Sequence, residues 1–356
     1  MSKTAVVLFN LGGPDSPEAI EPFLFNLFND PAILDMPRLI RWLVAKVIVK
    51  RRIPFARTIY GKIGNCSPIT QITAMQAKAL EKVLCDHERT VRVFPAMRYW
   101  HPFINDVAYD VKQWIPDSIV LLPLYPQFSM TTTGSSIKEW VHAIGETTIP
   151  TSIICCWPAE PQWIAAMADL TRGCLGKLQK HFATGTDFRP SRILLSAHGL
   201  PESIIAKGDP YQHHVEQTAV ALMAALGQPD LDYKICYQSR VGSGRWTSPA
   251  TVDLICQAGI DKVPIILLPI TFVSECSETN VELDIEYYHM AKTAGVPAYI
   301  RVPTVGTHPY FIAGLANMVR EAQERLNRRL EGRYGQGETC HCLPSQRQCA
   351  TLKRIT

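Results

Sequence analysis

The chain has 356 residues, of which 47% are hydrophobic and 19% charged, so it is expected to fold into two domains and is not a disordered chain. A formal net charge of +4 is too small to indicate nucleic acid, and we expect no such partner. We find no signal peptide and no apolar stretch near the roughly 18 residues of a membrane span, so we expect a cytoplasmic protein. Its eleven cysteines should mostly be reduced there, and a cluster of them would suggest a metal site.

Apolar runs in the first half predict parallel strands separated by helices. The first run, 5–9, ends in the sequence NLGGP at 10–14, where two glycines let the backbone approach a ligand closely. No GxGxxG follows it, so a dinucleotide is not indicated. The remaining elements of this half are a helix over 70–84 and strands over 90–97, 118–125 and 151–156.

A basic amphipathic helix is predicted over 36–50, with Asp35 as a cap and Pro37 in its first turn. One face is apolar, whereas the other is basic and runs into Arg51 and Arg52. Such a helix suits an anionic membrane surface or the lip of a pocket for an apolar, anionic ligand; the alternative is an ordinary surface helix packed on a core. The apolar face consists of Met36, Leu39, Ile40, Leu43, Val44, Val47 and Ile48.

In the second half, an apolar strand over 192–197 ends in the sequence SAHGLP at 196–201. Ligands of open α/β sheets bind at the carboxyl ends of the strands, so His198 is expected in a site. The alternative is a histidine whose hydrogen bonds are satisfied at the end of a strand. Helices are predicted over 163–181 and 308–329.

The two halves resemble each other. Residues 91–98 correspond to 233–240 and residues 121–125 to 267–271, and the turn after Leu11 corresponds to the turn after His198. We therefore predict an α/β fold of two Rossmann-like, doubly wound domains, each with a four-stranded parallel sheet flanked by helices, and a binding cleft between them. The expected boundaries are 1–165 and 166–307 for the halves, 308–333 for a closing helix and 334–356 for a cysteine-bearing tail.

Three glutamates spaced four residues apart, Glu278, Glu282 and Glu286, share one face if 277–290 is an α-helix. They form either a solvated acidic face or a path along which a divalent cation exchanges water for carboxylates. His198 and Glu278 follow neighbouring strands, so they can form a pair that binds a metal ion and accepts protons.

Three thiols in the polar tail, Cys340, Cys342 and Cys349, are too close in sequence and too polar in context to be core residues. A fourth cysteine would complete a site for zinc or an iron–sulfur cluster. We expect that ligand from Cys155 or Cys156, at the end of the fourth strand.

Over essentially its whole length, the chain resembles the ferrochelatase family. The motifs that carry the resemblance are NLGGP at 10–14, KRR at 50–52, SPI at 67–69, MRYWHP at 97–102, LYPQ at 124–127, TGSS at 133–136, SAHGLP at 196–201, YQSRVG at 237–242 and ELDIEY at 282–287. The resemblance implies the insertion of ferrous iron into protoporphyrin IX, with the loss of two protons, on two Rossmann-like halves.

The resemblance also implies roles for individual residues. His198 and Glu278 become the pair that binds substrate iron and accepts protons, and Glu282 and Glu286 continue the acidic path. The helix over 36–50 becomes a membrane-facing lip, so we expect peripheral membrane association. The implied porphyrin contacts are Leu11, Arg52, Tyr60, Ser67, Arg98, Tyr99 and Trp246.

The tail resembles that of bacterial members with a [2Fe-2S] cluster, and the implied ligands are Cys156, Cys340, Cys342 and Cys349, with Cys155 as the alternative to Cys156. Met130 and Cys276 depart from the animal enzymes, which have a cluster ligand and a histidine there. Glu160 and Asn317 replace a histidine and an aspartate, and we assign neither a catalytic part.

Two other functions stay open: a chelatase for cobalt, nickel or coproporphyrin, and a porphyrin or iron carrier without catalysis. A nucleotide-dependent dehydrogenase is disfavoured because Gly242 and Gly244 lack the third glycine and acidic residue of the dinucleotide motif. A homodimer is also left open.

Overall fold

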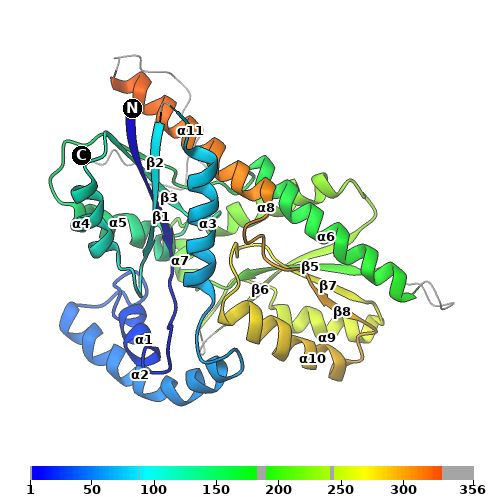
Figure 1. The fold of residues 1–356 in the computed structure, drawn as a ribbon. Coiled ribbons are helices and arrows are strands. Elements are labelled where there is room, and N and C mark those ends of the chain that lie inside the picture. The colour runs from blue at the N-terminus through cyan, green and yellow to red at the C-terminus, as the bar shows by residue number, and fades with distance from the viewer. Residues whose placement is uncertain (1, 88, 183–189, 241–243, 331–356) are drawn as a thin grey trace. The chain divides into compact units, whose positions relative to one another are not determined.

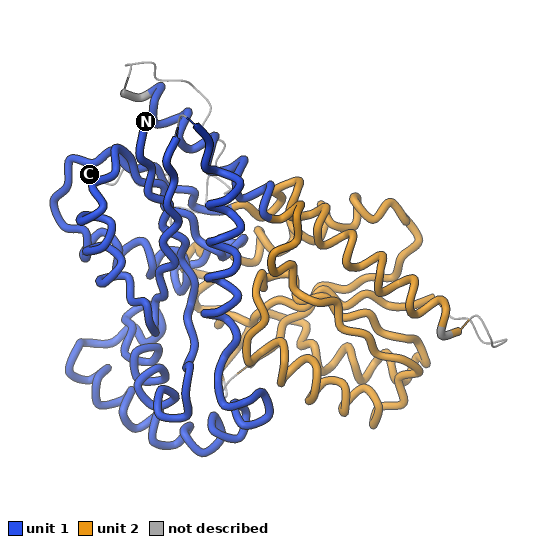
Figure 2. Tube along the Cα trace, viewed as in Figure 1, with its two compact units in different colours: residues 1–156, 312–341, 348–356 blue, residues 157–311, 342–347 orange. Residues whose placement is uncertain are grey.

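The computed structural model describes residues 2–87, 89–182, 190–240 and 244–330 (Figure 1). Within these residues the chain divides into two compact units (Figure 2). Unit 1 contains the described residues 2–156 and 312–330, and unit 2 contains those of 157–311. Each unit is an α/β fold.

The sheet of unit 1 has the strand order β2-β1-β3-β4, and every pair is parallel. Its central strand, β1, is apolar because both faces are covered. On one face Phe9 packs with residues of α4 and α5. On the other, Thr4 and Asn10 are hydrogen-bonded to side chains of α11 and α3. The strands are β1 (Ser2–Asn10), β2 (Arg89–Met97), β3 (Ser118–Pro123) and β4 (Thr151–Ile153), and the helices are α1 (Ile20–Phe28), α2 (Arg38–Gly61), α3 (Ile69–Leu84), α4 (Ile104–Trp114) and α5 (Ser135–Ile144).

The sheet of unit 2 is also fully parallel and has the equivalent order, β6-β5-β7-β8. Helices α9 and α10 pack on one face, over the apolar side chains of β5 and β7. The predicted fold class is therefore confirmed. The strands are β5 (Arg192–His198), β6 (Asp232–Gln238), β7 (Ile265–Pro269) and β8 (Tyr299–Arg301), and the helices are α6 (Pro161–Phe182), α7 (Glu202–Ala206), α8 (Tyr211–Leu226), α9 (Thr251–Asp261), α10 (Tyr287–Ala294) and α11 (Pro309–Leu330), the last of which runs into unit 1.

The strand registers align the two halves residue by residue. Phe9 is level with Pro123 in unit 1, and Ser196 is level with Pro269 in unit 2, so Leu11 and His198 are equivalent, as predicted. The predicted alignment of 91–98 with 233–240 is wrong by two residues, since Phe9 pairs with Ala96 and Ser196 with Cys236. A shift of two residues leaves each side chain on the same face of its strand, so the apolar pattern could not expose the error.

Each half has a π-helical segment after its third strand: η1 (Met130–Gly134) precedes α5, and η2 (Glu278–Glu286) precedes α10. The prediction of an α-helix over 277–290 is therefore wrong for its first part. At its end the N–H of Tyr287 donates to the carbonyl of Glu282, five residues back. Such wide turns are uncommon and are often found at functional sites.

Helix α2 differs from the predicted helix in its length. It starts after Pro37, which occupies the N-cap position without a capping side chain, and continues through Pro54 to Gly61. The prediction that it ends near residue 50 is therefore wrong. The side chains that α2 buries are Ala45, Val49, Ala56 and Tyr60.

Candidate functional site

His198 lies at the carboxyl end of β5, where its backbone is held at both polar groups. Its N–H donates to Thr271 Oγ1 at 3.3 Å, and its carbonyl accepts from the Tyr211 hydroxyl at 2.8 Å. Its ring Nδ1 lies 2.8 Å from the Gly199 carbonyl oxygen. A carbonyl only accepts, so Nδ1 carries a proton, and in the neutral ring Nε2 has the lone pair. The side chain is therefore prepared to bind a metal ion or to accept a proton through Nε2.

The turn after His198 packs against the segment that carries Trp246. The N–H of Gly199 donates to the carbonyl of Gln238 at 2.8 Å, and Pro201 forms a β-bridge with Trp246. A Cβ atom at Gly199 would lie 2.8 Å from that same carbonyl oxygen and 3.4 Å from the Trp246 ring. Because glycine has no Cβ atom, the backbone at Gly199 can lie this close to Gln238 and to the Trp246 ring. Trp246 therefore lies beside the His198 turn.

Glu278 opens η2 in the same unit and is half-buried. Its carboxylate accepts from the Ser277 hydroxyl at 2.9 Å. Next to it, burial and the negative charge of Glu278 raise the pKa of the Cys276 thiol well above its ordinary value. Burial and this charge therefore favour the neutral form of the Cys276 thiol.

Glu282 and Glu286 line a pocket of unit 2 with a volume of about 280 Å³. Glu282 is already bound to the protein, since its carboxylate accepts from the backbone and side chain of Ser239 and from the hydroxyl of Tyr287. The sequence pattern did not reveal this network, because Ser239 and Glu282 are 43 residues apart.

In unit 1, the structure brings most of the predicted porphyrin contacts into one neighbourhood. Leu11, Tyr60 and Tyr99 belong to one apolar cluster with side chains of α1 and α2. The guanidinium of Arg52 lies 5.5 Å from the ring centre of Phe28, a member of that cluster. Ser67 lies at the NLGGP turn, where its N–H donates to the carbonyl of Pro14 at 2.7 Å.

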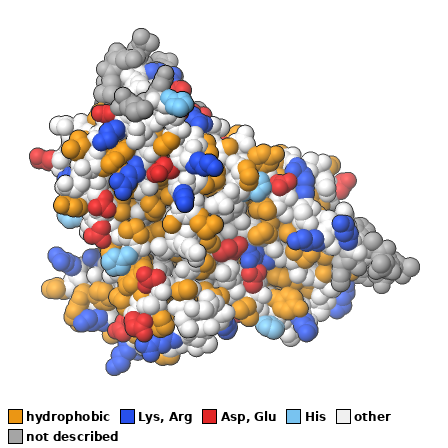
Figure 3. All heavy atoms as spheres, viewed as in Figure 1, with side chains coloured by type: hydrophobic (Ala, Val, Ile, Leu, Met, Phe, Trp, Pro, Cys, Tyr) orange, Lys and Arg blue, Asp and Glu red, His pale blue; other side chains and the backbone are white. Residues whose placement is uncertain are grey.

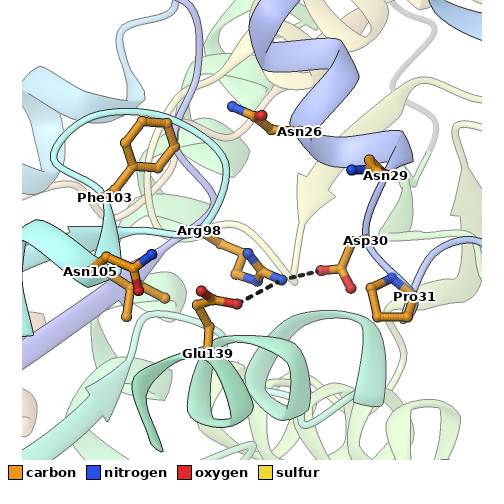
Figure 4. A pocket seen from close by; sticks show the side chains of 9 residues that line it. Asn26, Asn29, Asp30, Pro31, Arg98, Phe103, Asn105 and Glu139 are labelled. Carbon is orange, nitrogen blue, oxygen red and sulfur yellow. Dashed lines mark ion pairs between the residues drawn. The ribbon is translucent and has the colours of Figure 1, made fainter. Parts of the chain in front are cut away.

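Arg98 lies in a polar pocket of about 300 Å³ in unit 1 (Figure 4). Its guanidinium is paired with Asp30 at 2.9 Å and Glu139 at 3.5 Å. Asp30 also accepts from the hydroxyl of Tyr99 at 2.8 Å. The sequence analysis missed Asp30 and Glu139, because each is an isolated acid in its own segment. Two carboxylates already balance the charge of Arg98, so Arg52 is the freer cation of the two for an anionic ligand.

Comparison with known proteins decides the family. The family model described as Ferrochelatase matches residues 3–323. The chain belongs to the ferrochelatase family. Ferrochelatases of similar sequence include that of Pelagibacter ubique, 45% identical over 326 residues that cover 90% of this chain and 92% of that protein. The ferrochelatase of Caulobacter vibrioides is 47% identical over 322 residues, which cover 90% of each chain.

Among solved structures, SirB from Bacillus subtilis with Fe³⁺ superposes with a TM-score of 0.53 and 12% identity, covering 94% of this chain and 99% of that one. At this identity the likeness concerns the fold alone. The family resemblance predicted from the sequence motifs is confirmed.

Two adjacent cysteines follow β4. The Sγ atoms of Cys155 and Cys156 are 3.8 Å apart; Cys155 is buried and Cys156 is half-buried. The tail cysteines Cys340, Cys342 and Cys349 lie outside the described residues. Within the part of the chain that the structure describes, no three His, Cys, Asp or Glu side chains group into a metal site.

The outer face of α2 carries most of the apolar face predicted from the sequence. Leu39 is 79% exposed and Leu43 is 58% exposed, and Met36, Ile40 and Val47 are also exposed. Hydrophobic and basic side chains both reach the surface at the lower left of Figure 3, the region of α1 and α2 in Figure 1. Among the described helices, none is long and apolar enough to cross a membrane.

Proposed function

We propose that the protein inserts Fe(II) into protoporphyrin IX to form protohaem and release two protons, the terminal step of haem biosynthesis. The observation that carries the proposal is membership of the ferrochelatase family across residues 3–323. The geometry of His198 supports it, because the ring presents the lone pair of Nε2 at the carboxyl edge of a parallel sheet.

We assign the chemistry to His198 and Glu278. Two pyrrole N–H protons must leave as iron enters, so the site needs proton acceptors that also bind the incoming cation. Nε2 of His198 and the carboxylate of Glu278 are such groups, and they follow the neighbouring strands β5 and β7. A flat macrocycle hides its nitrogen lone pairs, so binding energy from the rest of the porphyrin is used to buckle the ring.

We assign porphyrin contact to the predicted residues of each unit. In unit 1 the apolar cluster supplies surface for the macrocycle, and Arg52 is suited to pair with a propionate. Arg98 acts there through its ion pairs, which hold Asp30 and the Tyr99 hydroxyl in place. In unit 2 Trp246 supplies an aromatic face beside the His198 turn. The unit 1 contacts are Leu11, Arg52, Tyr60, Ser67, Arg98 and Tyr99.

For the delivery of substrate iron, we propose an acidic line that ends at Glu278 and includes Glu286. Glu286 lines the pocket of unit 2 described above, where a hydrated cation can lose water stepwise. The sequence also placed Glu282 on this line, but its carboxylate is bound to the protein, and we return to it below.

We propose that a [2Fe-2S] cluster is held by Cys156 and the tail thiols Cys340, Cys342 and Cys349. The half-exposed Cys156 can reach a cluster at the surface, whereas Cys155 is buried behind it. When bound, such a cluster supplies a redox-active cross-link between the tail and the end of β4.

We further propose peripheral membrane association through α2, the entry side for a sparingly soluble porphyrin. Exposed leucines and isoleucine alternate there with Arg and Lys, the pattern of a helix that lies in a membrane interface.

The test of the function is an anaerobic assay. Purified protein is mixed with protoporphyrin IX and Fe(II), and haem formation is followed by absorbance and by the loss of porphyrin fluorescence. Multiple turnovers are expected. Binding of porphyrin without haem formation would contradict the proposal and indicate a carrier; turnover only with coproporphyrin, cobalt or nickel would indicate another chelatase. Gel filtration of the same preparation gives the oligomeric state and tests whether the protein is a homodimer.

A further inference from the structure

We propose that Glu282 is a positioning residue: its carboxylate holds the end of β6 at Ser239, and through Ser239 it holds the His198 turn and the Trp246 segment in place. The proposal rests on the function proposed above, since it concerns how the insertion site is held in shape. It replaces the role of Glu282 as a ligand for passing iron.

The carboxylate of Glu282 is saturated by protein donors. Oε1 accepts from the N–H of Ser239 and from the hydroxyl of Tyr287, each at 2.8 Å. Oε2 accepts from the hydroxyl of Ser239 and lies 3.5 Å from Nε2 of Gln238. A carboxylate offers about four lone-pair sites, so a passing cation could bind only by displacing these donors.

The backbone conformation of Ser239 needs the hydrogen bonds that Glu282 accepts from it. Its φ is +60°, in the left-handed region that residues other than glycine rarely adopt. Such a conformation persists only where the surroundings over-determine it. Glu282 contacts both the N–H and the hydroxyl of Ser239, so one side chain fixes the backbone and the rotamer of the same residue.

From Ser239 the constraint reaches His198 through backbone contacts. The preceding carbonyl, of Gln238, accepts the N–H of Gly199, the residue next to His198. Beyond Ser239, the guanidinium of Arg240 donates to the carbonyl of Thr247.

The segment that holds Trp246 is in turn paired with the His198 turn. The N–H of Thr247 donates to the carbonyl of Leu200 at 2.9 Å, and the N–H of Glu202 donates to the carbonyl of Arg245 at 3.0 Å. Displacing Ser239 would therefore move both the histidine and the tryptophan.

The two roles differ in whether they need the negative charge. In Glu282→Gln, the amide oxygen can keep both bonds of Oε1, and the amide N–H can donate to the Ser239 hydroxyl, which accepts as well as donates. The variant loses the charge but keeps most of the hydrogen bonds. A positioning role therefore tolerates glutamine and not alanine, whereas a metal ligand tolerates neither.

The experiment compares Glu282→Gln, Glu282→Ala, Ser239→Ala and the double variant Glu282→Ala/Ser239→Ala. Glu286→Gln is the matched control, because it removes a charge from the neighbouring acid of η2. For each protein, kcat and the KM for Fe(II) are measured with protoporphyrin IX, and the Kd for protoporphyrin IX is measured without iron by fluorescence.

We expect Glu282→Ala to lower kcat and weaken porphyrin binding by about tenfold each, and Glu282→Gln to recover most of both, with the KM for Fe(II) within about twofold. Ser239→Ala should share part of the loss. The double variant should be no worse than Glu282→Ala, because both changes remove the same contacts. Glu286→Gln should raise the KM for Fe(II) and leave porphyrin binding intact.

The proposal is overturned if Glu282→Gln raises the KM for Fe(II) as much as Glu282→Ala does while porphyrin affinity stays at its original value. It is also overturned if the effects of Glu282→Ala and Ser239→Ala multiply. If Glu282→Ala does not fold, the comparison of Glu282→Gln with Ser239→Ala decides between the two roles. A wild-type protein that inserts no iron would contradict the proposed function instead, and the porphyrin affinities of the variants would still test the coupling of Glu282 to Ser239.

Discussion

Arg98 and Arg52, both in unit 1, have different surroundings, and these give the two side chains different roles. Arg98 is held by Asp30 and Glu139, and its side chain is only 16% exposed. Arg52 contacts an aromatic ring, which leaves its hydrogen-bond donors for a ligand. An arginine with satisfied donors organises its neighbours, whereas one with open donors can bind an anion.

The role of His198 can be tested by removing its imidazole. His198→Ala should abolish iron insertion, because it removes the lone pair of Nε2, and should change the Kd for protoporphyrin IX by less than about threefold. Stopped assays of haem formation and fluorescence titrations measure the two quantities. His142→Ala, at an exposed histidine of α5, is the control. Insertion by the His198 variant at the original rate would remove this residue from the mechanism.

The adjacent thiols after β4 provide their own matched pair of variants. Cys156→Ser should lose the visible absorption bands of a [2Fe-2S] cluster, as should Cys349→Ser, because each removes one of four ligands. Cys155→Ser should keep the bands, since the Cys155 thiol is buried. Visible and circular-dichroism spectra of anaerobically purified protein measure this. The reverse result at the two positions would make Cys155 the ligand.

At the scale of elements, α2 exposes an apolar face because its buried contacts are made by other positions. The helix buries small and aromatic side chains, Ala45, Val49, Ala56 and Tyr60, and leaves the larger aliphatic stripe outside. A stripe of this width normally faces a core, so its exposure is consistent with the membrane contact proposed above.

Membrane binding by α2 can be tested by placing one negative charge on its apolar face. Leu43→Glu should reduce sedimentation with vesicles of anionic phospholipid by about fivefold or more, because a carboxylate enters an apolar face beside basic side chains. Ile260→Glu is the matched control, as Ile260 is 74% exposed on α9. Binding is measured at low and high salt. Equal loss in both variants would show that the effect is not specific to α2.

Close packing of α9 on the end of α10 depends on Gly259. A Cβ atom there would lie 2.2 Å from the carbonyl oxygen of Ala294. Gly259→Ala should therefore destabilise the protein by about 1–3 kcal/mol, the usual cost of overpacking. Gly173→Ala in α6, where a Cβ meets no atom within 4 Å, should be neutral or stabilising by up to about 1 kcal/mol. Denaturant unfolding measures both, and similar values for the two would contradict the close packing.

At the scale of the whole molecule, the chain repeats one sheet topology and places different chemistry on each copy. The orders β2-β1-β3-β4 and β6-β5-β7-β8 are equivalent, and each third strand is followed by a π-helical segment. At the equivalent place after the central strand, unit 1 has the apolar Leu11 and unit 2 has His198. The proposed porphyrin contacts accordingly lie mostly in unit 1, and the proposed metal ligands in unit 2.

The stability of the folded chain should depend on pH through Glu275. Burial by itself raises the pKa of this carboxyl, but the charge of Arg301 and hydrogen bonds that include the N–H of Thr304 bring the pKa below its ordinary value of 4.5. The folded state then binds fewer protons than the unfolded state, so this stabilisation is present above pH 4.5 and is lost as the pH falls through the lowered pKa.

Glu275→Gln should cost about 1–3 kcal/mol of unfolding free energy at pH 7, because it leaves Arg301 without one of its partners. The difference from wild type should shrink below pH 4.5. Glu18→Gln, at an exposed acid, should show neither effect. Urea unfolding across pH 3.5–7 tests this, and a difference that does not change with pH would rule out the ion pair as its source.

The sequence by itself determined the fold class, the places where strands end, and the family. These are local properties: the apolar period of a buried parallel strand, a glycine after His198 and a turn at 10–14 are written in neighbouring residues. The candidate residues His198 and Glu278 follow from the same signals, since ligands bind where parallel strands end.

Tertiary structure alone decided which charged groups are already engaged and which face of a helix is covered. Glu282 is held by Ser239, and Arg98 by Asp30, across 43 and 68 positions of chain, and no sequence period encodes such contacts. The spacing of apolar residues in α2 shows that one face of the helix is apolar, but it does not show that this face is exposed to solvent. The geometry of η2 was likewise not predicted, because glutamates four residues apart fit an α-helix and π-helical turns are rare.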